Sequence, residues 1–242
     1  MIFDVGLITE IIQTKYMINY PKELIHYIAL FDWDGTIVAS VKEKAKVLMN
    51  CLNDYNIDEK ILMKSIMKRT GVKRDIKIKE ILLECSEYNI NDNELNTILI
   101  NYSKQLTDIC NINPIPGFKD FIECRKSMSY ICSSAPRIEI ISGLAKINVP
   151  HELFTIFDKV AFKVEIFRQI KERSSFPIIS FGDSFTDYNA AISNDINFIG
   201  VCYDNEELSE MKNIRIINSY NDLVIRNESA QQSHAAGAEE RR

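Results

Sequence analysis

Short apolar segments alternate with amphipathic ones along most of this chain, and that order limits the folds open to it. Four segments are apolar enough for buried strands: Ile28 to Phe31, Tyr130 to Cys132, Ile178 to Phe181 and Phe198 to Cys202. Between the later strands, apolar residues recur at the spacing of a helix. The three sets are Phe118, Phe121 and Ile122; Ile138, Ile141 and Leu144; and Ile166, Phe167 and Ile170. This succession predicts an α/β fold in which helices cover both faces of a parallel sheet.

Residues 41–110 interrupt the alternation with successive helical patterns and no strand between them. One apolar stripe comprises Val41, Ala45, Leu48, Met49 and Leu52, and another comprises Leu95, Ile98, Leu99, Tyr102 and Leu106. Asn91 and Glu94 have the spacing of a capping pair at the start of the second stripe. We therefore expect a Rossmann-like core, residues 28–40 and 111–226, with an inserted all-helical cap over residues 41–110. Residues 1–27 are expected to form an N-terminal extension, and residues 227–242 a disordered tail without apolar anchors.

Charge and composition exclude several classes of function. A formal net charge of -5 and a pI near 5.4 give no basic field of the kind that holds nucleic acid or an anionic membrane. The chain has no apolar run of about 18 residues that could span a bilayer, and its first residues lack the pattern of a secretory signal. The six cysteines form no C-x-x-C pair and the three histidines are far apart, so we expect reduced thiols and no zinc site. These features predict a cytoplasmic protein whose partner is a small molecule.

The first predicted strand runs directly into Asp32-Trp33-Asp34-Gly35-Thr36. Ligands of open parallel sheets gather at the carboxyl ends of the strands, where these two acids stand. Residues i and i+2 of an extended backbone face the same side, so Asp32 and Asp34 can approach one reacting group. Gly35 permits a sharp turn and lets backbone N–H groups approach an anion. The competing interpretation is a pair of acidic turn residues that end a strand.

Two later strands end in further polar residues. Ser133 follows the second strand, and its hydroxyl can bind a phosphoryl oxygen or mark the start of a loop. Asp183 and Asp187 follow the third strand, and if the turn there is helical they share one face. Oxygen ligands at strand ends suit Mg²⁺. The competing interpretation makes Asp183 or Ser184 the N-cap of a helix.

A lysine between these segments is a candidate for neutralising a phosphoryl group. Lys163 precedes a helical pattern, and Lys159 is its rival. For either residue, the simplest interpretation is a solvated surface side chain.

In their order and spacing, the segments around Asp32, Ser133, Lys163 and Asp183 resemble the four motifs of the haloacid dehalogenase-like hydrolases. The resemblance covers about residues 27–225. The resemblance implies that the aspartate matching Asp32 attacks phosphorus, and that the one matching Asp34 protonates the leaving group and then activates water. The other motif positions fall on Ser133, Lys163, Asp183 and Asp187. The chain departs from the family in reading Ala39-Ser40 where relatives often have Asp-Ser, and in having Val164 after the lysine instead of proline. The helical insertion resembles the cap of phosphoglycolate phosphatase and beta-phosphoglucomutase relatives.

The function implied is that of a Mg²⁺-dependent phosphatase acting on a small phosphate monoester. Asp32, the backbone carbonyl of Asp34 and Asp183 would hold the metal, with Asp187 orienting bound water or a neighbouring group. The phosphoryl oxygens would be held by N–H groups near Gly35 together with Ser133 and Lys163. From its place at a predicted helix end in the insertion, we expect Arg74 to contact the leaving group and set specificity; the competing interpretation is a solvated arginine in the basic stretch from Lys68 to Arg74.

Two alternatives stay open. Gly71-Val72-Lys73-Arg74-Asp75 resembles the segment through which beta-phosphoglucomutases grip a second phosphate, which favours a phosphomutase. A protein that binds a phosphorylated ligand without turnover is the other alternative, although it would have no need of three convergent carboxylates.

Overall fold

A computed structural model describes residues 27–69, 71–107, 112–125 and 128–223. Its centre is a six-stranded sheet in which every neighbouring pair is parallel. In spatial order the strands are β5 (Phe154–Phe157), β4 (Ser129–Cys132), β1 (Ile28–Phe31), β6 (Ile178–Gly182), β7 (Asn197–Val201) and β8 (Arg215–Ile217). The prediction of an α/β core with a parallel sheet is confirmed.

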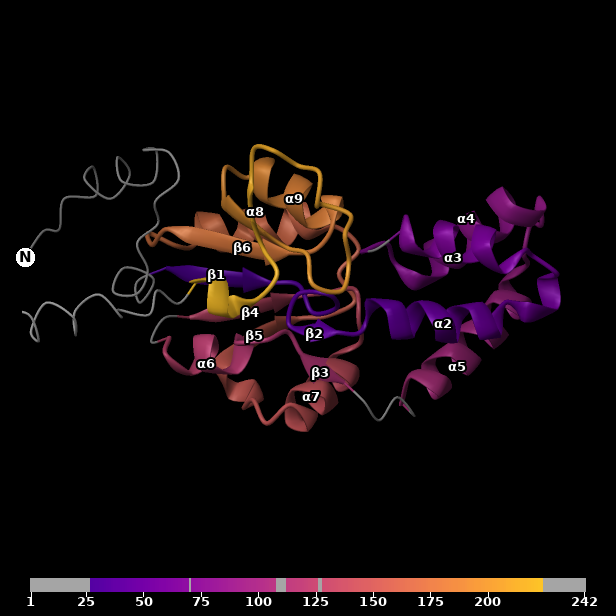
Figure 1. Cartoon of the computed structure of the whole chain (residues 1–242), viewed down its shortest axis with the longest axis horizontal. Helices are drawn as coiled ribbons and strands as arrows, with labels where there is room; N and C mark the ends of the chain where they lie inside the picture. The colour runs from indigo at the N-terminus through magenta and orange to yellow at the C-terminus, as the bar shows by residue number, and fades with distance from the viewer. Residues whose placement is uncertain (1–26, 70, 108–111, 126–127, 224–242) are drawn as a thin grey trace, which may run out of the picture.

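Helices pack on both faces of this sheet (Figure 1). On one side lie α6 (Phe118–Glu123) and α7 (Arg137–Lys146), and on the other α8 (Lys163–Glu172) and α9 (Phe185–Ile192). Alternate residues of β1 enter different apolar clusters: Phe31 packs with the cluster of α6 and α7, and Leu30 with that of α8 and α9. A strand buried on both faces reads as a continuous apolar run, which is why β1 is visible in the sequence.

A second group of helices leaves the core beyond the carboxyl end of β1 (Figure 1). Its stem is an antiparallel pair, β2 (Val38–Ala39) and β3 (Asn113–Pro114). Between them come α2 (Val41–Cys51), a short 3-10 turn (Asn53–Tyr55), α3 (Glu59–Met67), α4 (Arg74–Ser86) and α5 (Asp92–Thr107). These helices bury an apolar cluster of their own, and we call them the helical insertion.

The details of several elements differ from the sequence-based expectation. Neither β5 nor β8 was expected as a strand. The expected stripe of α7 is right at Leu144, which is buried, but wrong at Ile138, which is 75% exposed, because the helix turns Ile140 inward in its place. The capping pair of α5 is present, with the Asn91 side chain accepting from the Glu94 amide at 3.0 Å. The extension and the tail lie outside the described residues, apart from Tyr27.

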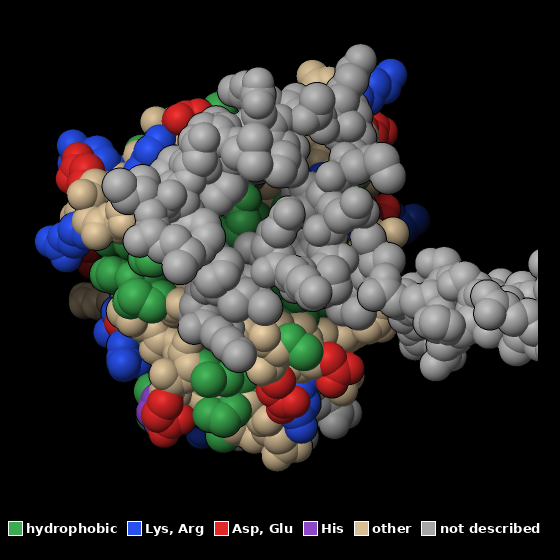
Figure 2. All heavy atoms as spheres, turned by 90° about the vertical axis from the view of Figure 1, so that its left-hand side faces the viewer, with side chains coloured by type: hydrophobic (Ala, Val, Ile, Leu, Met, Phe, Trp, Pro, Cys, Tyr) green, Lys and Arg blue, Asp and Glu red, His purple; other side chains and the backbone are tan. Residues whose placement is uncertain are grey.

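Figure 2 views the molecule from the end opposite the helical insertion. Among the described side chains on this face, basic and acidic groups are intermixed rather than gathered by sign. Within the described part of the chain, no helix has both the length and the apolar character needed to cross a membrane.

Candidate active site

Asp32 directly follows β1, at the carboxyl edge of the sheet. Its backbone amide donates to the Phe181 carbonyl of the neighbouring strand at 3.0 Å, which extends the pairing of β1 and β6 by one residue. Its side chain is buried, and its Oδ1 accepts a hydrogen bond from Lys163 Nζ at 2.7 Å. The sheet register therefore fixes the position of this carboxylate, and a lysine from α8 holds its orientation.

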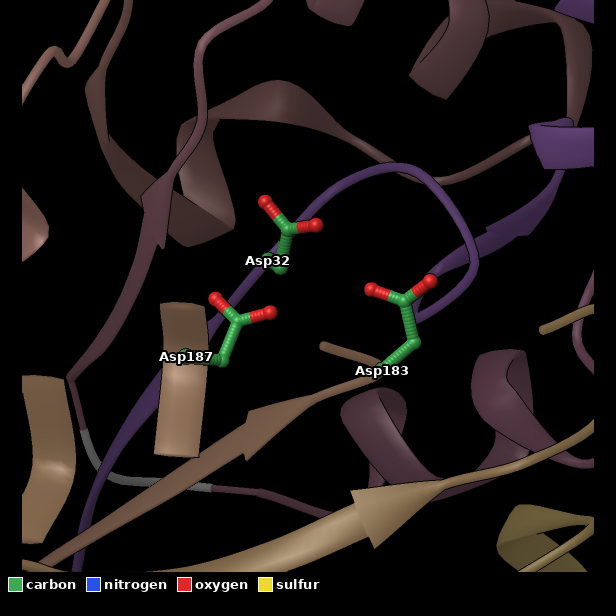
Figure 3. Close-up of side chains that lie close together, drawn as sticks. All are labelled: Asp32, Asp183 and Asp187. Carbon is green, nitrogen blue, oxygen red and sulfur yellow. The ribbon is translucent and has the colours of Figure 1, made fainter. Parts of the chain in front are cut away.

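Asp32, Asp183 and Asp187 bring their carboxylates together at this edge (Figure 3). One oxygen of each lies within 4.8 Å of the others, and all three side chains are buried. Lys163 Nζ also donates to Asp187 at 2.5 Å, so a single ammonium lies between two of the three acids. Asp183 is held from another side by Asn205, whose Nδ2 donates to its Oδ2 at 3.0 Å.

Asp183 and Asp187 do not share a helical face as expected, because α9 begins only at Phe185. Asp183 stands in the connection between β6 and α9, whereas Asp187 belongs to the first turn of the helix. Ser184 is the N-cap and forms a capping box with Asp187. The capping interpretation and the cluster of acids therefore both hold, since Asp187 uses Oδ2 for Ser184 and Oδ1 for Lys163.

Burial dominates the electrostatics of this cluster. It raises the pKa of Asp32 to about 7, with Lys163 opposing the change and Asp187 adding to it. Burial together with the charges of Asp32 and Asp187 raises the pKa of Asp183 well above its usual range. Burial alone would lower the pKa of Lys163, but the two flanking acids raise it. Three carboxylates face one ammonium, so a hard cation with oxygen ligands, such as Mg²⁺, fits the donor set.

Gly35 makes room for this cluster. Its φ is +75°, and a Cβ at this position would lie 2.1 Å from Asp183 Oδ2, so no larger residue fits without displacing a carboxylate. Its amide donates to the Val38 carbonyl at 2.8 Å. The expectation that N–H groups near Gly35 hold an anion stays a prediction, and it falls on the neighbouring amides, because the Gly35 N–H group is already used within the turn.

Asp34 has a different environment from Asp32, two residues earlier. Its carboxylate accepts hydrogen bonds from Ser40 and from Lys44 Nζ, the latter at 2.8 Å. Burial alone would raise the pKa of Asp34, but the charge and hydrogen bond of Lys44, with the bond from Ser40, hold it below the usual value. The two acids of the first motif are therefore shifted in opposite directions.

Ser133 and Lys163 are both buried at the carboxyl edge of the sheet. Ser133 is buried behind β4, lines the same cavity as Asp32, and accepts from the Ala135 amide at 3.1 Å. Lys163 is the first residue of α8 and is 3% exposed. Its rival Lys159 is exposed in the preceding loop, so the structure favours Lys163.

A cavity lies between the helical insertion and the carboxyl edge of the sheet, and both parts line it. The sheet side supplies Asp32, Asp34, Ser133, Ser134 and Asp183, and the insertion supplies Lys44, Arg74, Lys77 and Tyr102 with several apolar residues. Arg74, the first residue of α4, donates from Nη2 to Glu139 of α7 at 2.6 Å and stacks over the Tyr102 ring at 5.3 Å. Glu139 also accepts from Lys44, so one acid of the core holds two cations of the insertion.

The model of one protein family, "Haloacid dehalogenase-like hydrolase", matches residues 29–201, which include all the residues of the carboxylate cluster. The chain belongs to the haloacid dehalogenase-like hydrolase family. The resemblance inferred from the motifs and the expectation of a hydrolase are thereby confirmed. No curated protein sequence matches the chain.

Solved structures of this fold are similar over most of their length. CbbY from Rhodobacter sphaeroides, in complex with phosphate, is 16% identical, with a TM-score of 0.66 over 81% of this chain and 95% of the other. A predicted phosphoglycolate phosphatase from Haemophilus somnus is 18% identical, with a TM-score of 0.65 over 84% and 98%. A predicted phosphatase from Clostridium acetobutylicum is 22% identical, with a TM-score of 0.64 over 82% and 96%. At these identities, the likeness establishes the fold.

Several residues of this haloacid dehalogenase-like site were not expected from the sequence. They are Lys44, Lys77, Tyr102, Glu139 and Asn205, which contact the acids or line the cavity. The tyrosine was assigned only to the apolar stripe of its helix. The signal that could have found the charged ones is weak, because a lysine or glutamate on an amphipathic helix is usually solvated.

Proposed function

We propose that this haloacid dehalogenase-like hydrolase is a Mg²⁺-dependent phosphatase that hydrolyses a small phosphate monoester through a phosphorylated Asp32. The observation that carries the proposal is the opposite environment of two carboxylates at one strand end. Asp32 lies in the cluster of acids with Lys163, whereas Asp34 lies at the cavity wall with Lys44. This difference supports Asp32 as the nucleophile and Asp34 as the proton carrier.

The carboxylates of Asp32 and Asp183 and the backbone carbonyl of Asp34 would hold Mg²⁺, with Asp187 beside them, and the ion supplies charge neutralisation at the phosphoryl group. Lys163 and the Ser133 hydroxyl would bind phosphoryl oxygens. The three buried acids around one lysine support this assignment of the metal.

The reaction proceeds in two steps. An Asp32 oxygen attacks phosphorus, the bond to the leaving-group oxygen breaks, and Asp34 gives that oxygen its proton. Asp34, now ionised, takes a proton from water, the water oxygen attacks phosphorus, and Asp32 is released with inorganic phosphate. The hydrogen bonds from Lys44 and Ser40 favour the ionised form of Asp34, which the second step needs, and oppose the acid form, which the first step needs.

The names of two solved relatives agree with this chemistry. One is a predicted phosphoglycolate phosphatase, and the other, CbbY, contains phosphate. A phosphomutase is the second candidate, because Arg74 of the mutase-like segment lines the cavity. Product analysis separates the two: a phosphatase releases inorganic phosphate in proportion to the ester consumed, and a mutase yields an isomeric ester. The cytoplasmic location stays a prediction.

The test is release of phosphate from p-nitrophenyl phosphate with Mg²⁺ and with excess chelator. Wild type should be active with Mg²⁺ and inactive in chelator, and Ca²⁺ should substitute poorly because its longer bonds and higher coordination number loosen the attack geometry. Asp32→Asn should lose essentially all turnover, whereas Asp92→Asn, an exposed acid of α5, should keep it.

Mass spectrometry of rapidly quenched wild-type enzyme should locate a phosphoryl group on the peptide that contains Asp32. Full activity in chelator, or more than a few per cent of activity in Asp32→Asn, would contradict the proposal.

A further inference from the structure

The insertion side of the cavity carries an excess of positive charge. Lys44, Arg74 and Lys77 line the cavity from α2 and α4. The carboxylates that neutralise them are Asp34 and Glu139. Two acids contact these three cations, so one cation is left without an ion pair among the described residues, while Asp32 and Asp183 line the sheet side of the same cavity.

Lys77 is that remaining cation. Lys44 contacts both acids, and Arg74 contacts Glu139 at 2.6 Å. Within the described residues, the Lys77 ammonium makes no hydrogen bond and no ion pair, although it lines the cavity and is only partly exposed. Burial lowers the pKa of Lys77 to about 8, and the charge of Asp34 opposes this change. A cation in such a place is stabilised by any anion that enters the cavity.

Lys77 and Arg74 are placed to act on the same ligand. They stand three residues apart on α4, so they project from one face of the helix at neighbouring turns. Nη2 is the Arg74 atom that contacts Glu139, and a guanidinium has further N–H donors in the same plane. A fork of donors beside a single ammonium suits a group with two or three anionic oxygens.

We propose that the substrate carries a second anionic group on its leaving group, a carboxylate or a second phosphate, and that Lys77 binds it together with Arg74. This inference rests on the proposed phosphatase function, because it assigns the side of the same cavity that the helical insertion lines. All phosphate esters share the phosphoryl group, and that group is all that the carboxylate cluster can recognise together with Ser133 and Lys163. The surplus cation of α4 is what distinguishes a charged leaving group from a neutral one.

The experiment compares three esters of matched size: phosphoglycolate, ethylene glycol bisphosphate and ethylene glycol monophosphate. The first has a second charge as a carboxylate, the second as a phosphate, and the third has a neutral hydroxyl in its place. We expect wild type to favour at least one charged ester over the neutral one in kcat/KM. Lys77→Met should lower that ratio ~10- to 100-fold, the range for a lost hydrogen bond between charged groups, and Lys77→Arg should restore most of it. The control is Lys79→Met, an exposed lysine of the same helix that pairs with Asp92 at 3.1 Å.

Each outcome decides the question. Loss on phosphoglycolate alone identifies a carboxylate, and loss on the bisphosphate alone identifies a phosphate. An equal loss on all three esters would overturn the inference and place Lys77 in the support of Asp34, and no loss on any would also overturn it.

If wild type hydrolysed none of the three esters or p-nitrophenyl phosphate, the proposed function would fail. Calorimetric binding of the same esters would then decide the inference: it stands if Lys77→Met weakens binding of a charged ester more than that of the neutral one, and it fails otherwise.

Discussion

Lys44 donates a hydrogen bond from the helical insertion to Asp34 of the core, at 2.8 Å between Nζ and Oδ2. The contact joins a lysine of α2 to the acid that we assign as proton carrier, and it holds the pKa of that acid down against the effect of burial. The protonation state of Asp34 therefore depends on where the insertion lies.

Replacing Lys44 by methionine should raise the pKa of Asp34, because burial would no longer be offset. Protonation of an alkyl leaving group needs the acid form, so kcat/KM for an alkyl phosphate falls as pH rises through this pKa. The falling limb should therefore move to higher pH in Lys44→Met. Lys46→Met is the control, since Lys46 is an exposed lysine of the same helix that pairs with Glu43. If the falling limb of the kcat/KM profile lay at the same pH in Lys44→Met as in wild type, Lys44 would not set the pKa of Asp34.

Asp32 should make the metal-free protein less stable as pH rises. An aspartate ordinarily ionises near 3.8, whereas burial raises the pKa of Asp32 to about 7. Between these values the folded state binds more protons than the unfolded state, so the free energy of unfolding decreases with increasing pH. Asp32→Asn removes this contribution. In chelator, urea unfolding should show the variant gaining stability relative to wild type between pH 4 and pH 7.

With Mg²⁺ added at pH 8, wild type should become more stable to urea than Asp32→Asn, since the ionised Asp32 carboxylate would then bind the metal. Asp92→Asn, in which the exposed acid is changed, should follow wild type at every pH. A stability difference between wild type and Asp32→Asn that is constant with pH would contradict the raised pKa.

Lys163 should be far more sensitive to substitution than Lys159. Lys163→Met leaves Asp32 and Asp187 buried without their shared ammonium, and breaking a buried pair in this way costs about 3–5 kcal/mol of unfolding free energy. Turnover should be lost as well. Lys159→Met changes an exposed side chain and should alter neither. Chemical denaturation in chelator measures the first effect, and the result would contradict our assignment if the two variants behaved alike.

Arg74→Ala should lower kcat/KM for the best substrate by about 1.5–3 kcal/mol, the range for a charged hydrogen bond. The loss on p-nitrophenyl phosphate should be much smaller, because its leaving group offers no anionic oxygens. In this variant Glu139 would lose its ion pair with Arg74 and keep the one with Lys44. Arg69→Ala is the matched control, since that residue pairs with Glu80 and Glu84 and does not line the cavity. Equal losses on both esters would place Arg74 in folding or in the core chemistry.

The sequence predicts the strands that are buried on both faces and misses those that are not. The four inner strands of the sheet, β4, β1, β6 and β7, are short and largely apolar runs. By contrast, β5 exposes Thr155, and the three-residue β8 begins with the partly exposed Arg215; both strands lie at edges of the sheet. So short a segment of mixed exposure carries too little periodic signal to be separated from a loop.

Asp32 and Asp183 could be located from the sequence because each directly follows a recognisable strand, and Asp34 and Asp187 because they stand two and four residues further along. Their partners could not. Lys44 and Glu139 lie on helices of different parts of the fold, and each has the sequence context of a solvated residue. Their pairing arises only when α2 packs against the edge of the sheet near α7. Likewise, the hydrogen bond of the Gly35 amide depends on the local turn, which a motif alone does not specify.

The paired stem of the insertion has a consequence for how this enzyme can change. Val38 and Ala39 pair with Pro114 and Asn113, so the chain leaves and re-enters the core at adjacent points. The entropy of closing a loop grows only slowly with its length, and the six-stranded sheet keeps its register whatever lies between the two short strands. Mutation can therefore lengthen, shorten or rebuild the leaving-group pocket while the carboxylates stay in place, which makes the insertion the part of this hydrolase most open to evolutionary change.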